Sequence, residues 1–235
     1  MAKLVKGIYY GINMILLGLR GMKYAFIRKR SGEKAAMKYR DMAVLRWAEV
    51  TVKTVGLKVE INGRENIPAG ACVFISNHQS LLDIPVLLYS AQRTIGFIAK
   101  KELLKVPVIG FWIRLCCVAI DREDARAAVN VINAGADNVL NGLDMAIFPE
   151  GTRAKDGVMK EFKKGSIKLA TKAKAPIIPV TIDGTYKGYE LNKKFEKADV
   201  KVTFGQPIYT SNLTKEEERE LHKKVQDVIL SNFSQ

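Results

Sequence analysis

The sequence predicts an α/β domain, with a mixed, largely parallel sheet flanked by helices, preceded by a pair of N-terminal helices. In residues 56–235, short apolar runs typical of buried strands alternate with amphipathic stretches typical of helices. In residues 1–55, apolar residues instead recur at helical spacing. The chain has 235 residues, 48% of them hydrophobic and 26% charged, which suffices for one substantial core and excludes a disordered chain.

The N-terminal segment is predicted to form two helices. Residues 3–28 and 33–55 have helical patterning, and Arg30-Ser31-Gly32 interrupts it. At Gly56 the pattern changes to the alternation of a strand. We therefore divide the chain into an N-terminal helical segment, 1–55, and an α/β domain, 56–235.

Seven segments after Gly56 carry strand patterns. The first alternates apolar and polar residues as a half-buried strand does, and Asn62-Gly63 marks the turn after it. Those that follow are mostly short apolar runs of the length of buried strands. The predicted strands are residues 57–61, 72–76, 94–99, 116–120, 145–148, 177–182 and 200–204.

Helices are predicted between and after these strands, at residues 122–140, 165–173 and 214–232. The first of them has apolar residues at three- and four-residue spacing. The last opens at Thr214 with Glu217 three residues on, which is a capping-box pattern. Buried strands that alternate with helices indicate a largely parallel or mixed sheet.

The charge of the chain points to an anionic partner. Lys and Arg number 38 against 24 Asp and Glu, a net charge of +14. Residues 1–57 hold 12 basic and 3 acidic residues, so +9 of this excess lies there. The same stretch contains an uncharged run of 13 residues from Gly7 to Leu19, shorter than the about 20 that a membrane span needs. We expect a segment that lies in the interface of an anionic membrane, with a true span or a helix packed on the protein itself as alternatives.

Other partners are less favoured. The basic residues form no single stripe with stacking aromatics, so we expect no nucleic-acid partner. Cys72, Cys116 and Cys117 lie in or beside apolar runs, which favours small core residues of a reducing compartment over a disulfide framework. No metal-ligand spacing occurs in the sequence, and we expect no metal.

One of the two histidines lies in the segment Asn77-His78-Gln79-Ser80-Leu81-Leu82-Asp83, directly after an apolar run. Five residues correspond to about 500° of helix rotation, so His78 and Asp83 cannot meet on one regular helix. A loop that turns into a helix, with Asp83 as its N-cap and Pro85 in its first turn, brings them together. In that geometry the carboxylate accepts the Nδ1 proton of His78 and leaves Nε2 free to act as a general base.

Two other interpretations of this segment stay open. Ser80 would be a covalent nucleophile in a lipase or esterase, although the chain lacks a G-x-S-x-G elbow. In the third interpretation His78 is a buried histidine that is hydrogen-bonded to a capping aspartate and has no catalytic role.

The segment Phe148-Pro149-Glu150-Gly151-Thr152-Arg153 also follows an apolar run. Strand ends are where α/β proteins place ligands. Gly151 permits a close backbone approach, and the guanidinium of Arg153 suits a phosphate. The alternative is a solvated basic loop, because Lys160, Lys163 and Lys164 follow closely.

Together these two segments resemble the glycerolipid acyltransferases. Residues 77–83 resemble the NHxSxxD box of that family, and residues 148–153 resemble its FPEGTR box. Ile120-Asp121-Arg122 and the segment 175–180 resemble the second and fourth blocks, in the right order. The resemblance runs from about 70 to 185, and the bacterial 1-acylglycerol-3-phosphate O-acyltransferases are nearest in length.

The resemblance implies roles for individual residues. His78 would deprotonate the acceptor hydroxyl and Asp83 would orient it, while the thioester of acyl-CoA or acyl carrier protein serves as co-substrate without any further cofactor. The residues implied for the glycerol-phosphate site are Arg122, Glu150, Gly151, Thr152 and Arg153, with Lys100 and Lys101 as further candidates for the phosphate.

The reaction that this resemblance implies is transfer of a fatty acyl group to lysophosphatidic acid, which gives phosphatidic acid in phospholipid biosynthesis. The expected place is the cytoplasmic face of the cell membrane, with the protein peripheral or monotopic. Cys116, Cys117 and Ala119 stand in the second block where relatives often have Gly and Phe, so glycerol 3-phosphate or another lysophospholipid stays open as acceptor. From another class, a non-catalytic basic module that binds membranes would also account for the charge.

Overall fold

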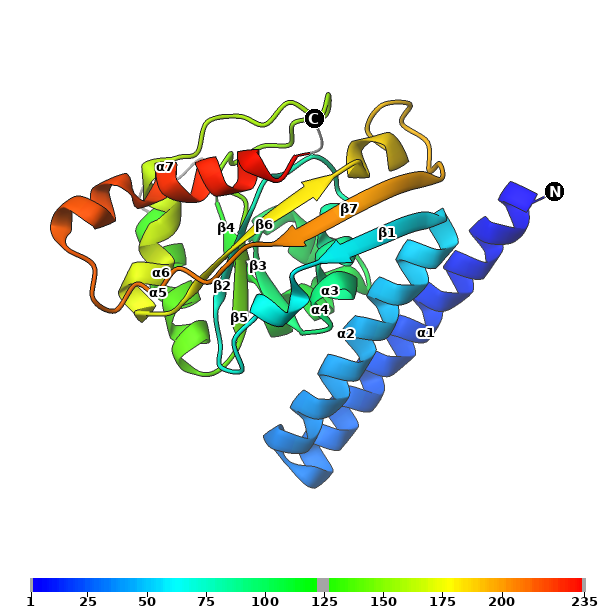
Figure 1. Ribbon diagram of the computed structural model, residues 1–235. Helices are drawn as coiled ribbons and strands as arrows, with labels where there is room; N and C mark the ends of the chain where they lie inside the picture. The colour runs from blue at the N-terminus through cyan, green and yellow to red at the C-terminus, as the bar shows by residue number, and fades with distance from the viewer. Residues whose placement is uncertain (1, 122–126, 234–235) are drawn as a thin grey trace.

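The computed structural model describes residues 2–121 and 127–233, and it shows a twisted seven-stranded sheet with helices on both faces (Figure 1). The α-helices of the described part are α1 (Ala2–Ser31), α2 (Glu33–Val55), α3 (Asp83–Ala91), α4 (Ile109–Cys116), α5 (Ala127–Leu140), α6 (Lys168–Ala173) and α7 (Lys215–Ser231). The strands are β1 (Leu57–Asn62), β2 (Val73–Ser76), β3 (Ile95–Lys100), β4 (Val118–Ile120), β5 (Asp144–Ile147), β6 (Ile177–Asp183) and β7 (Ala198–Phe204). Short 3-10 turns are η1 (Arg64–Asn66), η2 (Lys101–Lys105), η3 (Lys164–Ile167) and η4 (Thr185–Gly188).

The strands lie in the order β1-β7-β6-β2-β5-β3-β4. Every neighbouring pair is parallel except β6 and β7, which confirms the predicted mixed, largely parallel sheet. The five strands from β6 to β4 therefore all run in one direction, and their carboxyl ends lie at one edge of the sheet. In an open α/β sheet this edge is where ligands bind.

The core consists of two apolar layers, one on each face of the sheet. Successive strand residues point to opposite faces, so Phe74 of β2 belongs to one layer, while its neighbours Val73 and Ile75 belong to the other. The first layer joins α1, α2, α3 and α4, and the second joins α5, α6 and α7. The sheet therefore lies between the helical hairpin on one face and α5, α6 and α7 on the other.

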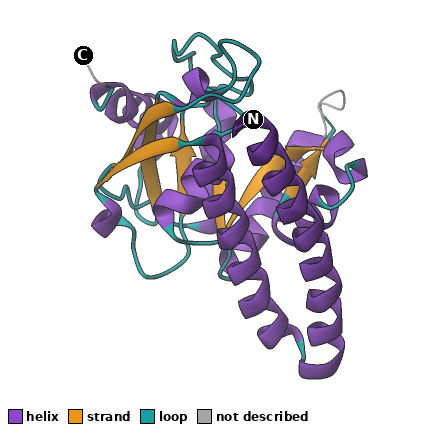
Figure 2. Ribbon diagram, turned by 90° about the vertical axis from the view of Figure 1, so that its right-hand side faces the viewer, coloured by secondary structure: helices purple, strands orange, loops and turns teal. Residues whose placement is uncertain are grey.

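The N-terminal helices form a long antiparallel hairpin whose turn extends beyond the sheet (Figures 1 and 2). Gly32 makes this turn with φ 83°, at the predicted break. On the inner face Leu17 is buried in the first core layer, and its carbonyl accepts a hydrogen bond of 3.3 Å from Trp112 Nε1. The hairpin is therefore anchored on the domain, and α2 ends at Val55, the last residue of the predicted helix.

The outer face of α1 is apolar and exposed over nearly its whole length. The large apolar residues exposed on it are Leu4, Val5, Ile8, Tyr9, Ile12, Ile15, Leu16, Leu19, Met22 and Phe26. At 1.5 Å per residue this stripe is about 33 Å long. In the described ranges 2–121 and 127–233 we find no helix with both the length and the apolar character that a membrane crossing requires.

Most predicted elements are present, and three predictions were wrong. The strand expected at 116–120 is shorter, because Cys116 ends α4, a helix that the almost continuous apolar run Ile109–Cys116 did not reveal. The N-cap of α3 is Leu82, and Asp83 is its first helical residue. The helix expected at 165–173 is the turn η3 followed by only six residues of α6. The predicted start of α5 at Arg122 falls outside the described residues, and the capping box at Thr214 is confirmed.

The three cysteines are free thiols of the interior. Cys72 and Cys116 are buried and Cys117 is half-buried. Burial raises the pKa of the Cys116 thiol to about 12 and that of Cys117 to about 11, so both are protonated at neutral pH. They pack as small apolar residues, as predicted.

Candidate active site

The two polar segments singled out in the sequence meet at the carboxyl edge of the central strands. The segment with His78 follows β2, and the segment with Glu150 follows β5, its parallel neighbour. Asn77 ties the first segment to β6, because its Nδ2 donates to the Ile182 carbonyl (2.7 Å) and its Oδ1 accepts from the Ile182 amide (2.8 Å). The loop after β2 is thus fixed to β6, the strand on one side of it.

His78 and Asp83 are in direct contact. The distance from His78 Nδ1 to Asp83 Oδ2 is 2.7 Å, and Asp83 is fully buried. The same carboxylate oxygen accepts from the backbone amides of Gln79 (2.7 Å) and Ser80 (2.9 Å). Since these two amides fix Oδ2 as an acceptor, Nδ1 carries the proton and Nε2 is the nitrogen left to act as a base.

Thr185, which the sequence analysis missed, completes this arrangement. Thr185 opens η4, directly after β6, and its hydroxyl donates to the second oxygen of Asp83, Oδ1. Thr185 is 102 residues from Asp83 in the chain and lies outside both sequence boxes, so no local pattern revealed it. The buried carboxylate has donors on both oxygens, which is the condition for keeping a charge in the interior.

An aromatic wall covers one side of the imidazole. The ring of His78 stacks on Phe148 with centroids 4.0 Å apart, and Phe148 in turn stacks on Phe97 of β3 at 6.1 Å. The side chain of His78 is 18% exposed, so the ring is fixed between apolar and polar neighbours and still reaches solvent. Phe97 and Phe148 belong to the core layer that also contacts the helical hairpin.

Glu150 links the two boxes. Its Oε1 accepts from the His78 amide (2.6 Å) and its Oε2 from the Lys160 amide (2.9 Å). Burial raises the pKa of this carboxyl, although the two amide bonds oppose the shift. Both carboxylate oxygens of Glu150 are thus bound to backbone amides, one of them the amide of His78.

Gly151 follows with φ 70°, and a Cβ there would lie 2.9 Å from Lys163 Nζ, so the glycine allows this lysine to approach the loop.

Arg153 forms an ion pair with the segment after β6, which the sequence analysis did not single out. Its Nη1 lies 2.6 Å from Oε1 of the buried Glu190, and Lys193 Nζ lies 3.2 Å from Oε2 of the same carboxylate. Burial alone would raise the pKa of Glu190, but the bonds from Lys193 and the Leu81 amide and the charge of Arg153 lower it overall. Thr152, between Gly151 and Arg153, is exposed.

The remaining predicted binding residues lie farther along the same edge. Lys100 ends β3 and lies 3.5 Å from Glu102, and Lys101 pairs with Asp121, directly after β4. Because β5 separates β3 from β2, this cluster lies on the β3–β4 side of His78, whereas Arg153 pairs with a residue that follows β6. Arg122 lies outside the described residues.

Comparison with known proteins places this geometry in a family. Residues 58–183 match the family described as Acyltransferase, and they contain His78, Asp83 and the whole FPEGTR segment. The chain belongs to the acyltransferase family.

Similar proteins agree with this assignment. The chain is 34% identical to the chloroplastic 1-acyl-sn-glycerol-3-phosphate acyltransferase BAT2 of Brassica napus, over 85% of this chain and 58% of that protein. It is 32% identical to a probable 1-acyl-sn-glycerol-3-phosphate acyltransferase of Mycoplasma pneumoniae, over 77% and 73%. The crystal structure of the 1-acyl-sn-glycerophosphate acyltransferase PlsC from Thermotoga maritima superposes with a TM-score of 0.76 at 30% identity, covering 96% of this chain and 99% of that one. The chain spans 58% and 47% of the length of the two plant relatives BAT2 and LPAT1.

The structure places Ser80 in a structural role. It is fully buried, and its Oγ accepts a hydrogen bond of 3.2 Å from the Leu82 amide. We predict that Ser80→Ala retains acyl transfer within about threefold and stays insensitive to serine-directed fluorophosphonates, because it loses one hydrogen bond of about 1 kcal/mol. Turnover assays of both proteins with and without inhibitor test this. A complete loss of turnover in a folded Ser80→Ala protein would restore the nucleophile hypothesis.

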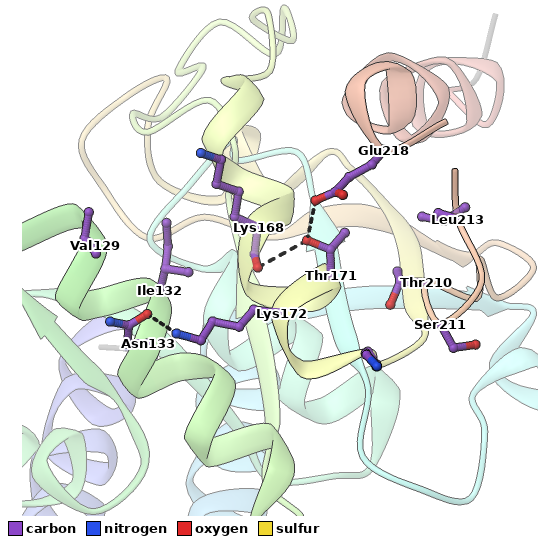
Figure 3. A pocket seen from close by; sticks show the side chains of 11 residues that line it. Val129, Ile132, Asn133, Lys168, Thr171, Lys172, Thr210, Ser211, Leu213 and Glu218 are labelled. Atoms are coloured by element: carbon purple, nitrogen blue, oxygen red, sulfur yellow. Dashed lines mark hydrogen bonds between the residues drawn. The ribbon is translucent and has the colours of Figure 1, made fainter. Parts of the chain in front are cut away.

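A hollow elsewhere on the acyltransferase is not part of this site. It measures about 550 Å³ and lies between α5, α6 and the segment before α7. Figure 3 shows Lys168 and Lys172 on its wall, with Lys172 hydrogen-bonded to Asn133, and no residue of the two boxes lines it.

In residues 2–121 and 127–233 there is no group of three or more His, Cys, Asp or Glu side chains that could hold a metal ion.

Proposed function

We propose that this acyltransferase moves a fatty acyl group from an acyl thioester to the free hydroxyl of lysophosphatidic acid and so forms phosphatidic acid in phospholipid biosynthesis. The observation that carries the proposal is the contact of 2.7 Å between His78 Nδ1 and the buried Asp83, at the ligand-binding edge of the sheet. The similar proteins named 1-acyl-sn-glycerol-3-phosphate acyltransferase support the choice of acceptor.

In the proposed reaction, His78 Nε2 takes the proton of the acceptor hydroxyl as its oxygen attacks the thioester carbonyl. The tetrahedral intermediate collapses by breaking the C–S bond, and the imidazolium returns the proton to the departing thiolate. Asp83 stabilises the imidazolium between these two steps. Glu150 positions the backbone of His78, and Gly151, Thr152 and Arg153 form the wall on which the glycerol phosphate lies.

Lys100, at the end of β3, and Lys101, directly after it, form the second basic part of the proposed site. Arg122, which lies outside the described residues, is proposed as a further binding residue on the strength of the second sequence block alone. The acyl thioester of CoA or acyl carrier protein is the co-substrate, and no other cofactor is proposed. Activity should accordingly survive dialysis against a chelator.

The reaction is tested by acyl transfer from labelled acyl-CoA in detergent. Lysophosphatidic acid, glycerol 3-phosphate and lysophosphatidylcholine are run in parallel as acceptors. Product from lysophosphatidic acid alone supports the proposal, and preference for another acceptor keeps the chemistry and changes the substrate. Failure with all three, also with acyl carrier protein as donor, would favour a non-catalytic membrane-binding module.

We further propose that α1 lies in the interface of an anionic membrane, at the cytoplasmic face of the cell membrane, with its exposed stripe in the acyl-chain boundary. The apolar outer face and the +9 charge of residues 1–57 support this orientation. The acceptor is itself a lipid, so the active site would receive it from the surface on which the protein lies.

This placement predicts that Ile8→Glu with Ile15→Glu lowers binding to phosphatidylglycerol vesicles at least about tenfold. Both residues lie on the exposed stripe, and burying one apolar side chain is worth about 1.5–3 kcal/mol. Co-sedimentation measures the binding, and Leu140→Glu, at an equally exposed position on α5, is the matched control. Equal loss in the control, or no loss in the double variant, contradicts the placement of α1.

A further inference from the structure

The segment after β6, residues 184–197, folds back over the active site, although the family match ends at residue 183. Thr185 donates to Asp83, and Glu190 accepts from the Leu81 amide at 3.3 Å. A Cβ on Gly157, in the loop after Arg153, would lie 2.8 Å from the ring of Tyr186. Since Glu190 also pairs with Arg153, this segment contacts both boxes at once.

Glu190 is the most buried charge of this segment. Its side chain is 1% exposed, and each of its oxygens binds one cation, Arg153 Nη1 at 2.6 Å and Lys193 Nζ at 3.2 Å. The two cations are more open to solvent, at 35% for Arg153 and 59% for Lys193. One buried carboxylate thus holds two partly exposed cations side by side.

The charges of this cluster favour a bound anion. Two cations on one carboxylate leave a net charge of +1. A guanidinium has five N–H donors and an ammonium three, and the bond to Glu190 uses one from each. Glu190 also accepts from the amide of Leu81, three residues from His78, so the cluster is attached to the loop that carries the proposed base.

The backbone of Lys193 has an unusual conformation, which is a second sign of a functional position. Its φ is 52°, in the left-handed region that lysine rarely adopts. Residues held in such conformations concentrate at functional sites, because the surrounding structure must offset their cost. Lys193 is held there with its ammonium on Glu190.

We propose that Glu190 positions Arg153 and Lys193 as a two-cation fork that binds the phosphate of the acceptor lipid, with Lys193 as a binding residue outside the family match. The inference rests on the proposed function, because it takes a phosphate-bearing acceptor as the substrate. A planar guanidinium beside an ammonium offers several donors to the phosphate oxygens, and charge-assisted hydrogen bonds of this kind are the strong ones.

The test is a comparison of KM and kcat in mixed micelles for the wild type, Lys193→Met, Lys193→Arg and Glu190→Gln. We expect Lys193→Met to raise KM for lysophosphatidic acid about tenfold, with kcat and the KM of the acyl donor within twofold. Lys193→Arg restores most of the affinity, because it keeps the charge. Glu190→Gln raises KM at least as much as Lys193→Met, since it releases both cations.

Two controls separate binding from a general structural effect. Lys194→Met removes an exposed lysine next in the chain and should leave KM unchanged. A 1-acylglycerol acceptor, which lacks the phosphate, should show the same KM with the wild type and Lys193→Met. If Glu190→Gln fails to fold, the two Lys193 variants still decide the question.

The possible results distinguish a failure of the two-cation fork from a failure of the proposed reaction. If the wild type acylates lysophosphatidic acid and Lys193→Met does so with unchanged KM, the fork is wrong and the reaction stands. If the wild type acylates no lysophosphatidic acid, the reaction is wrong, and calorimetry with glycerol 3-phosphate tests the fork alone. Binding that Lys193→Met weakens about tenfold supports the fork, and absent or unchanged binding overturns it.

Discussion

Replacing His78 by alanine is expected to lower kcat for acyl transfer by about 10²–10⁴-fold, the contribution that a positioned general base makes. Nδ1 of the imidazole is held by Asp83, so Nε2 is the only nitrogen available for the acceptor proton. The variant should bind both substrates, because its change is confined to proton transfer. Steady-state kinetics with lysophosphatidic acid and acyl-CoA measures kcat and KM separately.

The fold should survive this substitution. Without the imidazole, Asp83 still accepts from the amides of Gln79 and Ser80 and from the hydroxyl of Thr185, so no buried charge is left without donors. What is lost is the hydrogen bond from His78 Nδ1 to Asp83 and the stacking of the ring on Phe148, at the partly exposed edge of the core. A thermal unfolding midpoint within a few degrees of the wild type is expected, since 1 kcal/mol shifts the Tm of a protein of this size by about 2–4 °C.

The other histidine of the chain is the matched control. His222 lies on α7, in the helix layer on the far face of the sheet, and His222→Gln should keep turnover. If the folded His78→Ala protein keeps more than a tenth of the wild-type kcat, His78 is not the base. Vesicle binding should be equal in the wild type and His78→Ala, which separates catalysis from the membrane-binding module.

The sequence predicted the parts of this site that are local. His78 and Asp83 lie five residues apart, and the loop that joins them could be inferred because a regular helix keeps them apart. The seven strands were visible because buried strands are short apolar runs between helices. The sequence also placed each box after an apolar run, and the structure shows that the two strands, β2 and β5, are parallel neighbours whose carboxyl ends lie at one edge.

The contacts between distant segments could not be predicted, because strand order decides them. Glu150 reaches the amide of His78 across 72 residues, and Thr185 reaches Asp83 across 102. Both contacts depend on β2 lying between β5 and β6, an order that apolar patterning does not encode. For the same reason nothing in the sequence singled out Glu190, and only the fold shows that it is buried against Arg153.

Asp83→Asn is expected to lower kcat about 10²-fold, less than the about 10⁴-fold typical of serine-hydrolase triads, where the amide turns and stabilises the wrong tautomer. Here the amides of Gln79 and Ser80 both point at Oδ2, so the side-chain oxygen of asparagine must occupy that position. It can still accept the Nδ1 proton of His78. The tautomer is kept, and what is lost is the negative charge that stabilises the imidazolium.

Nitrogen NMR of the imidazole reports which ring nitrogen carries the proton. It therefore distinguishes loss of the negative charge alone from a change to the wrong tautomer. Nδ1 should be protonated in both the wild type and Asp83→Asn. Thr185→Val, which removes only the donor to Oδ1, is the milder comparison and should cost less than tenfold in kcat, because Oδ2 keeps its three partners. If Asp83→Asn keeps the full kcat, the carboxylate only holds the loop in place and does not assist catalysis. If the proton of the variant is found on Nε2, the amides of Gln79 and Ser80 do not control the orientation of residue 83.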